Sequence, residues 1–132
     1  MINYKKILFR LKQECEKSTH NRRMAAAVLK RGRIIGIGHN FLGRYTDPNA
    51  PHPFGAIHAE WSAYKDACRS IQRESDGAKF GGHCMIVARL DRWGFFRIAK
   101  PCKFCMEFLK QTGLRSVLYT KTDNPELGWE EL

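Results

Sequence analysis

The sequence predicts an α/β protein, a three-layer α-β-α sandwich around a mixed central sheet of four or five strands. Two observations carry this prediction. The expected elements follow one another in the order helix, strand, strand, helix, strand, helix, strand. Only residues 121–132 then follow Thr120, too few for another crossover helix and strand, so a last strand should return antiparallel to its neighbour.

Length and composition indicate one globular domain spanning residues 1–132. Hydrophobic residues make up 43% of the chain and charged residues 27%, which is typical of a folded protein. We find no apolar signal-peptide block and no apolar run that could cross a membrane, so we expect a cytoplasmic protein with no membrane partner. Five cysteines in such a chain do not predict a disulfide framework.

The chain is strongly basic. Lysine and arginine number 23 against 13 acidic residues, giving a formal charge of +10 and a pI near 9.7. This excess favours a partner that carries phosphate, with a polynucleotide ahead of a mononucleotide. The sequence leaves the oligomeric state open, although an exposed apolar helix face would allow a homodimer.

The first half of the chain predicts a helix followed by a hairpin. Apolar residues at helical spacing predict a helix from Tyr4 to Cys15. Residues 24–29 and 34–38 predict two strands joined by the glycine-containing turn 30–33. Gly36 and Gly38 leave one face of the second strand bare, which permits close approach of a helix or ligand.

Residues 41–55 predict an irregular loop, long enough to be functional, in which His52 either gates a pocket or is an ordinary loop residue. The elements expected after it are a helix over 56–72, a central strand over 84–88, a small hairpin over 91–97, a helix over 101–111, and strands over 117–119 and 128–132.

Two short motifs carry the chemistry: His58-Ala59-Glu60 and Pro101-Cys102-Lys103-Phe104-Cys105. Cys102 and Cys105 lie three residues apart, so on a helix both thiolates face the same side. Together with His58 they provide three ligands for Zn²⁺, one ion per chain, and leave the fourth tetrahedral position open, as in catalytic zinc sites. Glu60 is a carboxylate beside this site and is suited to move protons.

Other interpretations of these motifs remain open. A C-x-x-C pair also occurs in structural zinc sites and in redox-active proteins. A closed structural site would need a fourth ligand from the remaining candidates, which are His39, His52, His83 and Cys84.

The two motifs together resemble the zinc signature of the cytidine and deoxycytidylate deaminase superfamily. Residues 26–40 are similar to the first hairpin of that family, and residues 113–119 to the strand after its second zinc helix. The resemblance implies a cytidine-deaminase-like fold, zinc ligands at His58, Cys102 and Cys105, and Glu60 as the proton shuttle. It also implies that Asn40 holds the base or sugar, that Ala59 lines the pocket, and that the backbone around Lys100 faces the exocyclic amine.

We therefore expect hydrolytic conversion of cytosine to uracil, in single-stranded DNA or RNA, with a cytosine-containing nucleic acid or nucleotide as partner. Interleaved basic and aromatic residues suit phosphate contacts and base stacking, and the stretch that leads to the second motif offers Arg89, Arg92, Trp93, Phe95, Phe96 and Arg97. The alternatives are deamination of free cytidine or (d)CMP, deamination of adenosine as in tRNA-type enzymes, and a zinc-stabilised nucleic-acid-binding module without activity.

Overall fold

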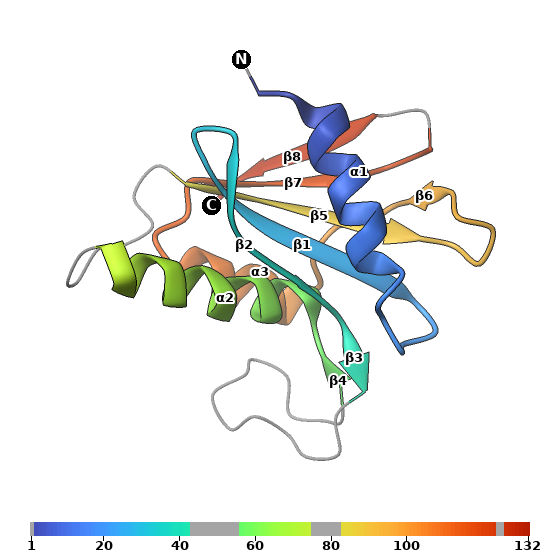
Figure 1. Cartoon of the computed structure of the whole chain (residues 1–132), viewed down its shortest axis with the longest axis horizontal. Coiled ribbons are helices and arrows are strands. Elements are labelled where there is room, and N and C mark those ends of the chain that lie inside the picture. Colours follow the sequence, from blue (N-terminus) through green and yellow to red (C-terminus); the bar gives the residue numbers. More distant parts are fainter. Residues whose placement is uncertain (1, 43–55, 75–82, 124–125) are drawn as a thin grey trace.

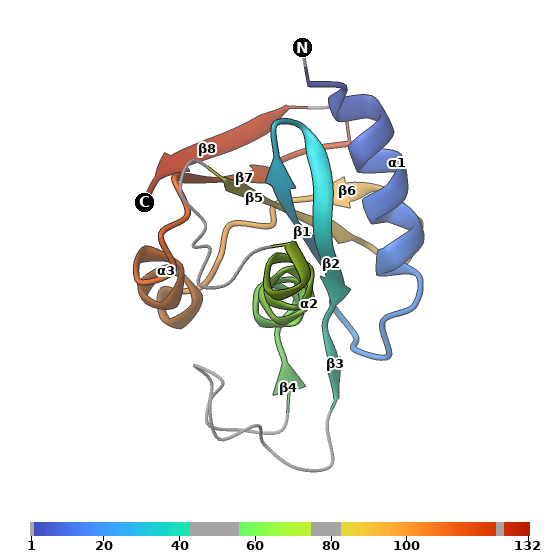
Figure 2. The same ribbon diagram turned by 60° about the vertical axis from the view of Figure 1, so that its left-hand side comes forward.

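The computed structural model describes residues 2–42, 56–74, 83–123 and 126–132. Its main sheet has six strands. Five run in the order β2 (Arg33–His39), β1 (Arg23–Lys30), β5 (Cys84–Leu90), β7 (Ser116–Thr120) and β8 (Leu127–Glu131), and β6 (Phe96–Arg97) pairs with β5. Helix α1 (Tyr4–Cys15) lies on one face, and α2 (Ala59–Glu74) and α3 (Lys103–Lys110) lie on the other (Figures 1 and 2). The predicted three-layer sandwich is confirmed.

Strands β1 and β2 form the predicted hairpin. Their antiparallel register pairs Lys30 with Arg33, so the turn contains only Arg31 and Gly32. Both turn residues have positive φ, 52° and 79°, which is the geometry of a two-residue turn matching the twist of the strands. Glycine adopts this conformation without steric cost, and Arg31 is the only non-glycine residue with positive φ in the described part of the chain.

Helix α1 covers one face of the sheet with the apolar stripe that the sequence predicted. The Asn3 side chain caps the helix by accepting a hydrogen bond from the Lys6 N–H at 3.2 Å. Ile7, Leu8, Leu11 and Cys15 are buried against alternate residues of β1 and β5. Burial raises the pKa of Cys15 to about 12, so this thiol is apolar core material.

The opposite face of the sheet is covered by α2 and α3. Ala59, Ala63 and Ala67 of α2 are buried there against the side chains of β1, β5 and β7. A methyl group placed on Gly36 or Gly38 would overlap Ala67 or Ser62 of the helix. Gly36 and Gly38 therefore permit the close approach of a helix, which is one of the two alternatives, helix or ligand, that the sequence left open.

The second half of the sheet also follows the prediction. β5 is central, antiparallel to β1 and parallel to β7. β8 returns antiparallel to β7. The predicted hairpin after β5 is present, with Arg89 opposite Arg97 in β5 and β6. In its loop, Asp91 accepts hydrogen bonds from the backbone N–H groups of Trp93 and Phe95, and Gly94 has a φ of 85°.

Three element boundaries were wrong. Residues 41–42 and 56–57 form a small antiparallel sheet, β3 (Phe41–Leu42) with β4 (Ala56–Ile57), rather than loop and helix. Helix α2 therefore starts at Ala59, and α3 starts at Lys103 instead of residue 101. Pairing of β3 with β4 is a contact between distant residues, and local patterns carry no signal for it. Residues 43–55, including His52, lie outside the described residues.

No helix within the described residues has both the length and the apolar composition needed to cross a bilayer.

Candidate metal centre and substrate pocket

His58 reaches the site from the N-terminal end of α2. It stands between β4 and the helix, and its carbonyl accepts the first helical hydrogen bond, from the Ser62 N–H at 3.1 Å. Because β4 pairs with β3 at the end of β2, the small sheet places this helix start at one end of the main sheet (Figure 1).

The two cysteines come from the start of α3. Cys102 has extended backbone angles and is the residue before the helix, and its carbonyl accepts from the Met106 N–H at 2.9 Å. Cys105 lies one turn later and is fully buried, whereas Cys102 is exposed. We had expected both cysteines within the first turn; Cys102 instead precedes it, yet the three-residue spacing still turns both thiols to one side.

The nitrogen of His58 and the sulfur atoms of Cys102 and Cys105 all lie within 4.8 Å of one another. Sγ of Cys105 is 3.7 Å from Nδ1 of His58. In the described part of the chain no further histidine, cysteine or carboxylate joins this group, so His39, His83 and Cys84 are not a fourth ligand. Nδ1 of His39 contacts Oε2 of Glu14 instead, at 2.6 Å.

Glu60 lies in the first turn of α2 and is almost completely buried, with 2% of its surface exposed. Its Oε1 atom has no hydrogen-bond partner among the described residues. Burial raises the pKa of Glu60, although a hydrogen bond with Cys105 opposes the shift. Burial also raises the pKa of Cys105, and the neighbouring charges of Glu60 and Cys102 raise it further.

This arrangement fits a divalent metal ion. One imidazole nitrogen and two sulfur atoms are the ligand types that zinc prefers. A cation among them would favour the charged forms of the nearby thiols and carboxyl, which burial alone disfavours. The unpartnered Glu60 oxygen beside three such atoms is costly unless a ligand accompanies it.

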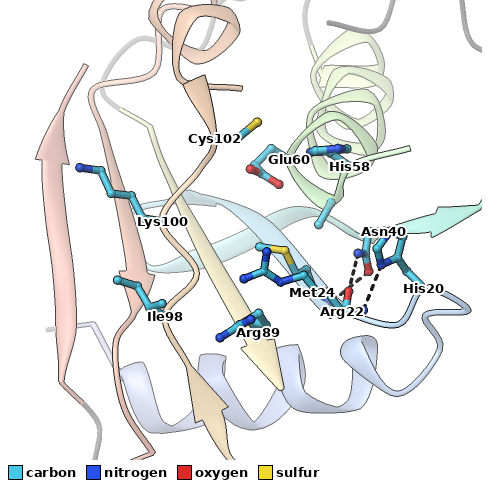
Figure 3. A pocket seen from close by; sticks show the side chains of 11 residues that line it. His20, Arg22, Met24, Asn40, His58, Glu60, Arg89, Ile98, Lys100 and Cys102 are labelled. Atoms are coloured by element: carbon cyan, nitrogen blue, oxygen red, sulfur yellow. Dashed lines mark hydrogen bonds between the residues drawn. The ribbon is translucent and has the colours of Figure 1, made fainter. Parts of the chain in front are cut away.

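A cavity of about 260 Å³ opens beside these residues. It is close to the lower end of the range for small-molecule pockets, about 300–1,000 Å³. Its lining residues come from both chain halves and are His20, Arg22, Met24, Asn40, His58, Ala59, Glu60, Arg89, Ile98, Lys100 and Cys102 (Figure 3). The structure thus brings His58, Cys102 and Glu60 to one cavity with all three residues expected to bind substrate, Asn40, Ala59 and Lys100. Cys105 belongs to the metal-ligand group but does not line this cavity.

Asn40 is buried in the pocket wall and holds the chain segment that precedes β1. Its Oδ1 accepts from the Met24 N–H at 2.9 Å and from Ser18 Oγ at 2.6 Å. Its Nδ2 donates to the carbonyl of Arg22. Among the described residues Nδ2 has this one acceptor, so its second N–H is available to a ligand.

The Lys100 side chain points away from Glu60 and forms an ion pair with Glu130 of β8, at 2.7 Å (Figure 3). From the sequence we expected the backbone around Lys100, and not its side chain, to face the substrate. This backbone is held to β7, because the N–H of the neighbouring Ala99 donates to the carbonyl of Thr120 at 2.9 Å. Lys100 therefore ties the segment before α3 to the edge of the sheet.

The expected nucleic-acid contacts fall into different environments. Arg89 lines the pocket. Trp93 is 66% exposed and Arg92 lies over its ring, 4.3 Å from the centroid. Arg97 forms an ion pair with Asp91 at 2.8 Å. Phe96 packs against the core under α1, whereas Phe95, its neighbour, is 48% exposed and is the better placed of the two for stacking.

Sequence reasoning missed His20, Arg22, Met24 and Ile98 as pocket residues. Met24 was assigned only to a strand, and Arg22 falls between the predicted helix and that strand. They reach the pocket through the pairing of β1 with β5 and through the Asn40 side chain. The sequence offered one signal for these residues, which was the resemblance that placed Asn40 in the pocket. Met24 and Arg22 are hydrogen-bonded to Asn40, so a pocket that contains Asn40 also brings them close to it.

An open ligand position beside a buried acid–base residue is typical of metal-dependent hydrolases. Residues 2–121 match the model of a protein family described as the cytidine and deoxycytidylate deaminase zinc-binding region. This chain therefore belongs to the cytidine and deoxycytidylate deaminase family. No curated protein sequence matches it significantly.

Solved structures of similar fold agree with the family. A cytidine deaminase from Burkholderia pseudomallei superposes with a TM-score of 0.67 at 14% identity, covering 98% of this chain and 93% of that one. The dCMP deaminase of cyanophage S-TIM5 gives 0.62 at 19% identity, covering 89% and 81%. A deaminase/reductase from Thermotoga maritima gives 0.56 at 22% identity, covering 89% of this chain and 29% of that one. At these identities the likeness shows the fold alone.

Proposed function

We propose that this protein is a zinc-dependent hydrolytic deaminase that converts cytosine to uracil and binds one zinc ion per chain through His58, Cys102 and Cys105. The observation that carries the proposal is the buried Oε1 of Glu60, which has no hydrogen-bond partner among the described residues and belongs to the same cavity as His58 and Cys102 of this three-residue group. A non-catalytic zinc module would have no use for this carboxyl, because a buried polar atom without a partner costs stability.

When bound, zinc would supply a Lewis acid that makes water nucleophilic near neutral pH. Glu60 would accept one proton from the attacking water at Oε1 and pass it to the ring nitrogen of cytosine. It would then accept the remaining proton of the added hydroxyl group and pass it to the departing amine, which leaves as ammonia as the carbonyl of uracil forms. Asn40 would donate its remaining N–H to the base or sugar. Ala59 and Met24 would provide apolar contacts to the ring, and the overall reaction releases ammonia.

Two substrate forms have support. A single-stranded polynucleotide is favoured by exposed Trp93 and Phe95, by Arg92 beside them, and by the net charge of +10. A free nucleotide is favoured by the fold neighbour from cyanophage S-TIM5, a dCMP deaminase whose structure is also known in complex with dCMP and dUMP. Cytosine is proposed over adenine in both cases, in agreement with the family.

The test offers purified protein cytidine, dCMP, single-stranded DNA and single-stranded RNA side by side, with adenosine included, and measures ammonia and the product base. We expect uracil products, and Glu60→Gln should lower turnover by about 10²–10⁴-fold while its zinc content and fold are retained. Glu60→Ala should behave in the same way. A Glu60 variant that retains zinc and releases ammonia at the wild-type rate would refute the proposed mechanism.

The panel also decides between substrates. Turnover of oligonucleotides with none of free nucleotides would establish the polynucleotide form, and the reverse result would exclude it. Inosine as the only product would overturn the assignment of cytosine.

A further inference from the structure

The end of the pocket away from Cys102 is strongly positive. Figure 3 shows Arg22, Met24 and Arg89 together there, on the far side of Glu60 from Cys102. Three basic side chains other than histidine line the cavity, and Lys100 is already paired with Glu130. For Arg22 and Arg89, no carboxylate of the described residues forms an ion pair with the guanidinium group.

Strand pairing explains why these two arginines meet. Met24 of β1 is the direct partner of Arg89 in β5, so their side chains lie on the same face of the sheet. Arg22 lies two residues before Met24, just outside β1, and lines the same cavity. The main chain of Arg22 is held at both ends, because its N–H donates to His20 Nδ1 at 3.0 Å and its carbonyl accepts from Asn40 Nδ2.

Arg89 carries an unmet hydrogen-bonding demand. Its Nε atom is buried and has no hydrogen-bond partner in the part of the chain that the structure describes. The nearby carboxylate of Asp91 is used within its own hairpin, by the N–H groups of Trp93 and Phe95 and by Nε of Arg97. Burial lowers the pKa of Arg89, and the positive charges of Arg22 and Arg97 lower it further. An anion between Arg22 and Arg89 would satisfy the donor and offset this repulsion.

We propose that Arg22 and Arg89 form a phosphate subsite, so that the substrate of this pocket is a phosphorylated nucleotide and not a free nucleoside. This inference rests on the proposed deaminase function. Guanidinium groups match the geometry of phosphate oxygens and bind them through paired, charge-assisted hydrogen bonds. The phosphate is either the monoester of a mononucleotide or a diester of a polynucleotide, since both offer the same anionic oxygens.

The test measures binding of the product, so that it does not depend on turnover. Calorimetry with the zinc-loaded protein compares dUMP, deoxyuridine and a short single-stranded oligonucleotide containing one deoxyuridine. We expect a phosphorylated ligand to bind at least tenfold more tightly than deoxyuridine. Arg89→Gln and Arg22→Gln should each weaken that ligand about tenfold or more, as expected for charge-assisted hydrogen bonds, and leave deoxyuridine unchanged.

Arg33→Gln is the matched control, because Arg33 is an exposed arginine of β2 that does not line the pocket. It should change none of these affinities by more than about twofold at constant salt. Arg22 is exposed, so its variant should fold even if the partly buried Arg89 variant does not. Inorganic phosphate, compared with chloride at equal ionic strength, should raise the melting temperature of the wild type but not of Arg22→Gln.

Tight binding of dUMP indicates the monoester, and tight binding of only the oligonucleotide indicates the diester. Equal affinity for dUMP, oligonucleotide and deoxyuridine, or wild-type affinities in both arginine variants, would overturn the subsite. Turnover separates this failure from that of the deaminase function. If no cytosine compound is deaminated but phosphate binding still depends on Arg22, the phosphate subsite is supported and the deaminase function is refuted. If deoxycytidine, dCMP and the oligonucleotide react with equal kcat/KM, the deaminase function is supported and the phosphate subsite is refuted.

Discussion

Sγ of Cys105 lies 3.7 Å from Nδ1 of His58, although 47 residues separate the two in the chain. The contact forms because α2 and α3 cover the same face of the sheet (Figure 2), with His58 and the two cysteines at the N-terminal ends of these helices within 4.8 Å of one another. Cys102 completes the group from the position just before α3. Two helix starts thus bring together three side chains that could hold a metal ion.

Metal binding should depend on each of these three side chains. Cys102→Ser, Cys105→Ser and His58→Ala should each lower the zinc content of the purified protein from one ion per chain to well below half, measured by elemental analysis. Cys84→Ser is the control, because Cys84 lies outside the group and should leave the zinc content unchanged. Full zinc occupancy in Cys105→Ser would contradict the assignment.

The cysteines should differ sharply in reactivity. With a pKa near 12, Cys15 is present as thiolate at a fraction of about 10⁻⁴ at pH 8. In chelator-treated native protein, iodoacetamide should therefore modify exposed Cys102 while Cys15 remains intact until denaturant unfolds the chain. Mass spectrometry of peptides after timed labelling measures both rates. Native Cys15 reacting as fast as Cys102 would show that it is not buried under α1.

Gly36 should be required for the packing of α2 on β2. A methyl group at this position would overlap the backbone of Ala67. Gly36→Ala should lower the free energy of unfolding by about 1–3 kcal/mol through overpacking, more than the roughly 0.4–1 kcal/mol that alanine contributes by restricting the unfolded chain. Urea denaturation measures the change. Arg33→Ala, at an exposed position of β2, should stay within about 0.5 kcal/mol of the wild type.

Glu14 should contribute pH-dependent stability. Burial acts to raise the pKa of this carboxyl, but hydrogen bonds with His39 and Lys17 outweigh it and hold the pKa below its ordinary value of 4.5. A carboxyl whose pKa is lower in the folded state stabilises the fold above pH 4.5, and this contribution is lost as pH falls through the folded pKa.

Glu14→Gln should therefore be less stable than the wild type by about 1–3 kcal/mol near neutral pH, with the difference shrinking at low pH. Unfolding free energies from urea titrations across this range measure it. Glu16→Gln, in the exposed turn that follows α1, should show no such pH-dependent difference. A constant difference for Glu14→Gln at every pH would assign its effect to packing instead of charge.

Asn40 should act through the segment that it holds. Asn40→Ala removes hydrogen bonds to Met24, Ser18 and Arg22 and leaves the Met24 N–H without an acceptor. We expect a loss of about 1–3 kcal/mol in stability and a higher KM, because Arg22 and Met24 line the pocket. Ser18→Ala, which removes a single bond of this set, should have the same effects to a smaller degree. An unchanged KM in Asn40→Ala would contradict this role.

Most of the architecture could be predicted from local patterns. The hairpin of β1 and β2, the central position of β5 and the antiparallel return of β8 were all expected. Strand patterns and turn residues can be recognised within short stretches of the sequence. The β3–β4 pair was missed. Two residues per strand give no periodicity, and the pairing joins segments on either side of residues 43–55.

The sequence by itself determined which side chains are the candidate metal ligands, since the spacing of Cys102 and Cys105 and the motif around His58 already offer three donor atoms and one further carboxylate. Only the tertiary structure decided what surrounds them. Arg22 and Arg89 reach the same pocket because Met24 pairs with Arg89 across two strands, and a register between distant strands leaves no trace in local sequence. The positive end of the pocket is therefore a property of the folded sheet.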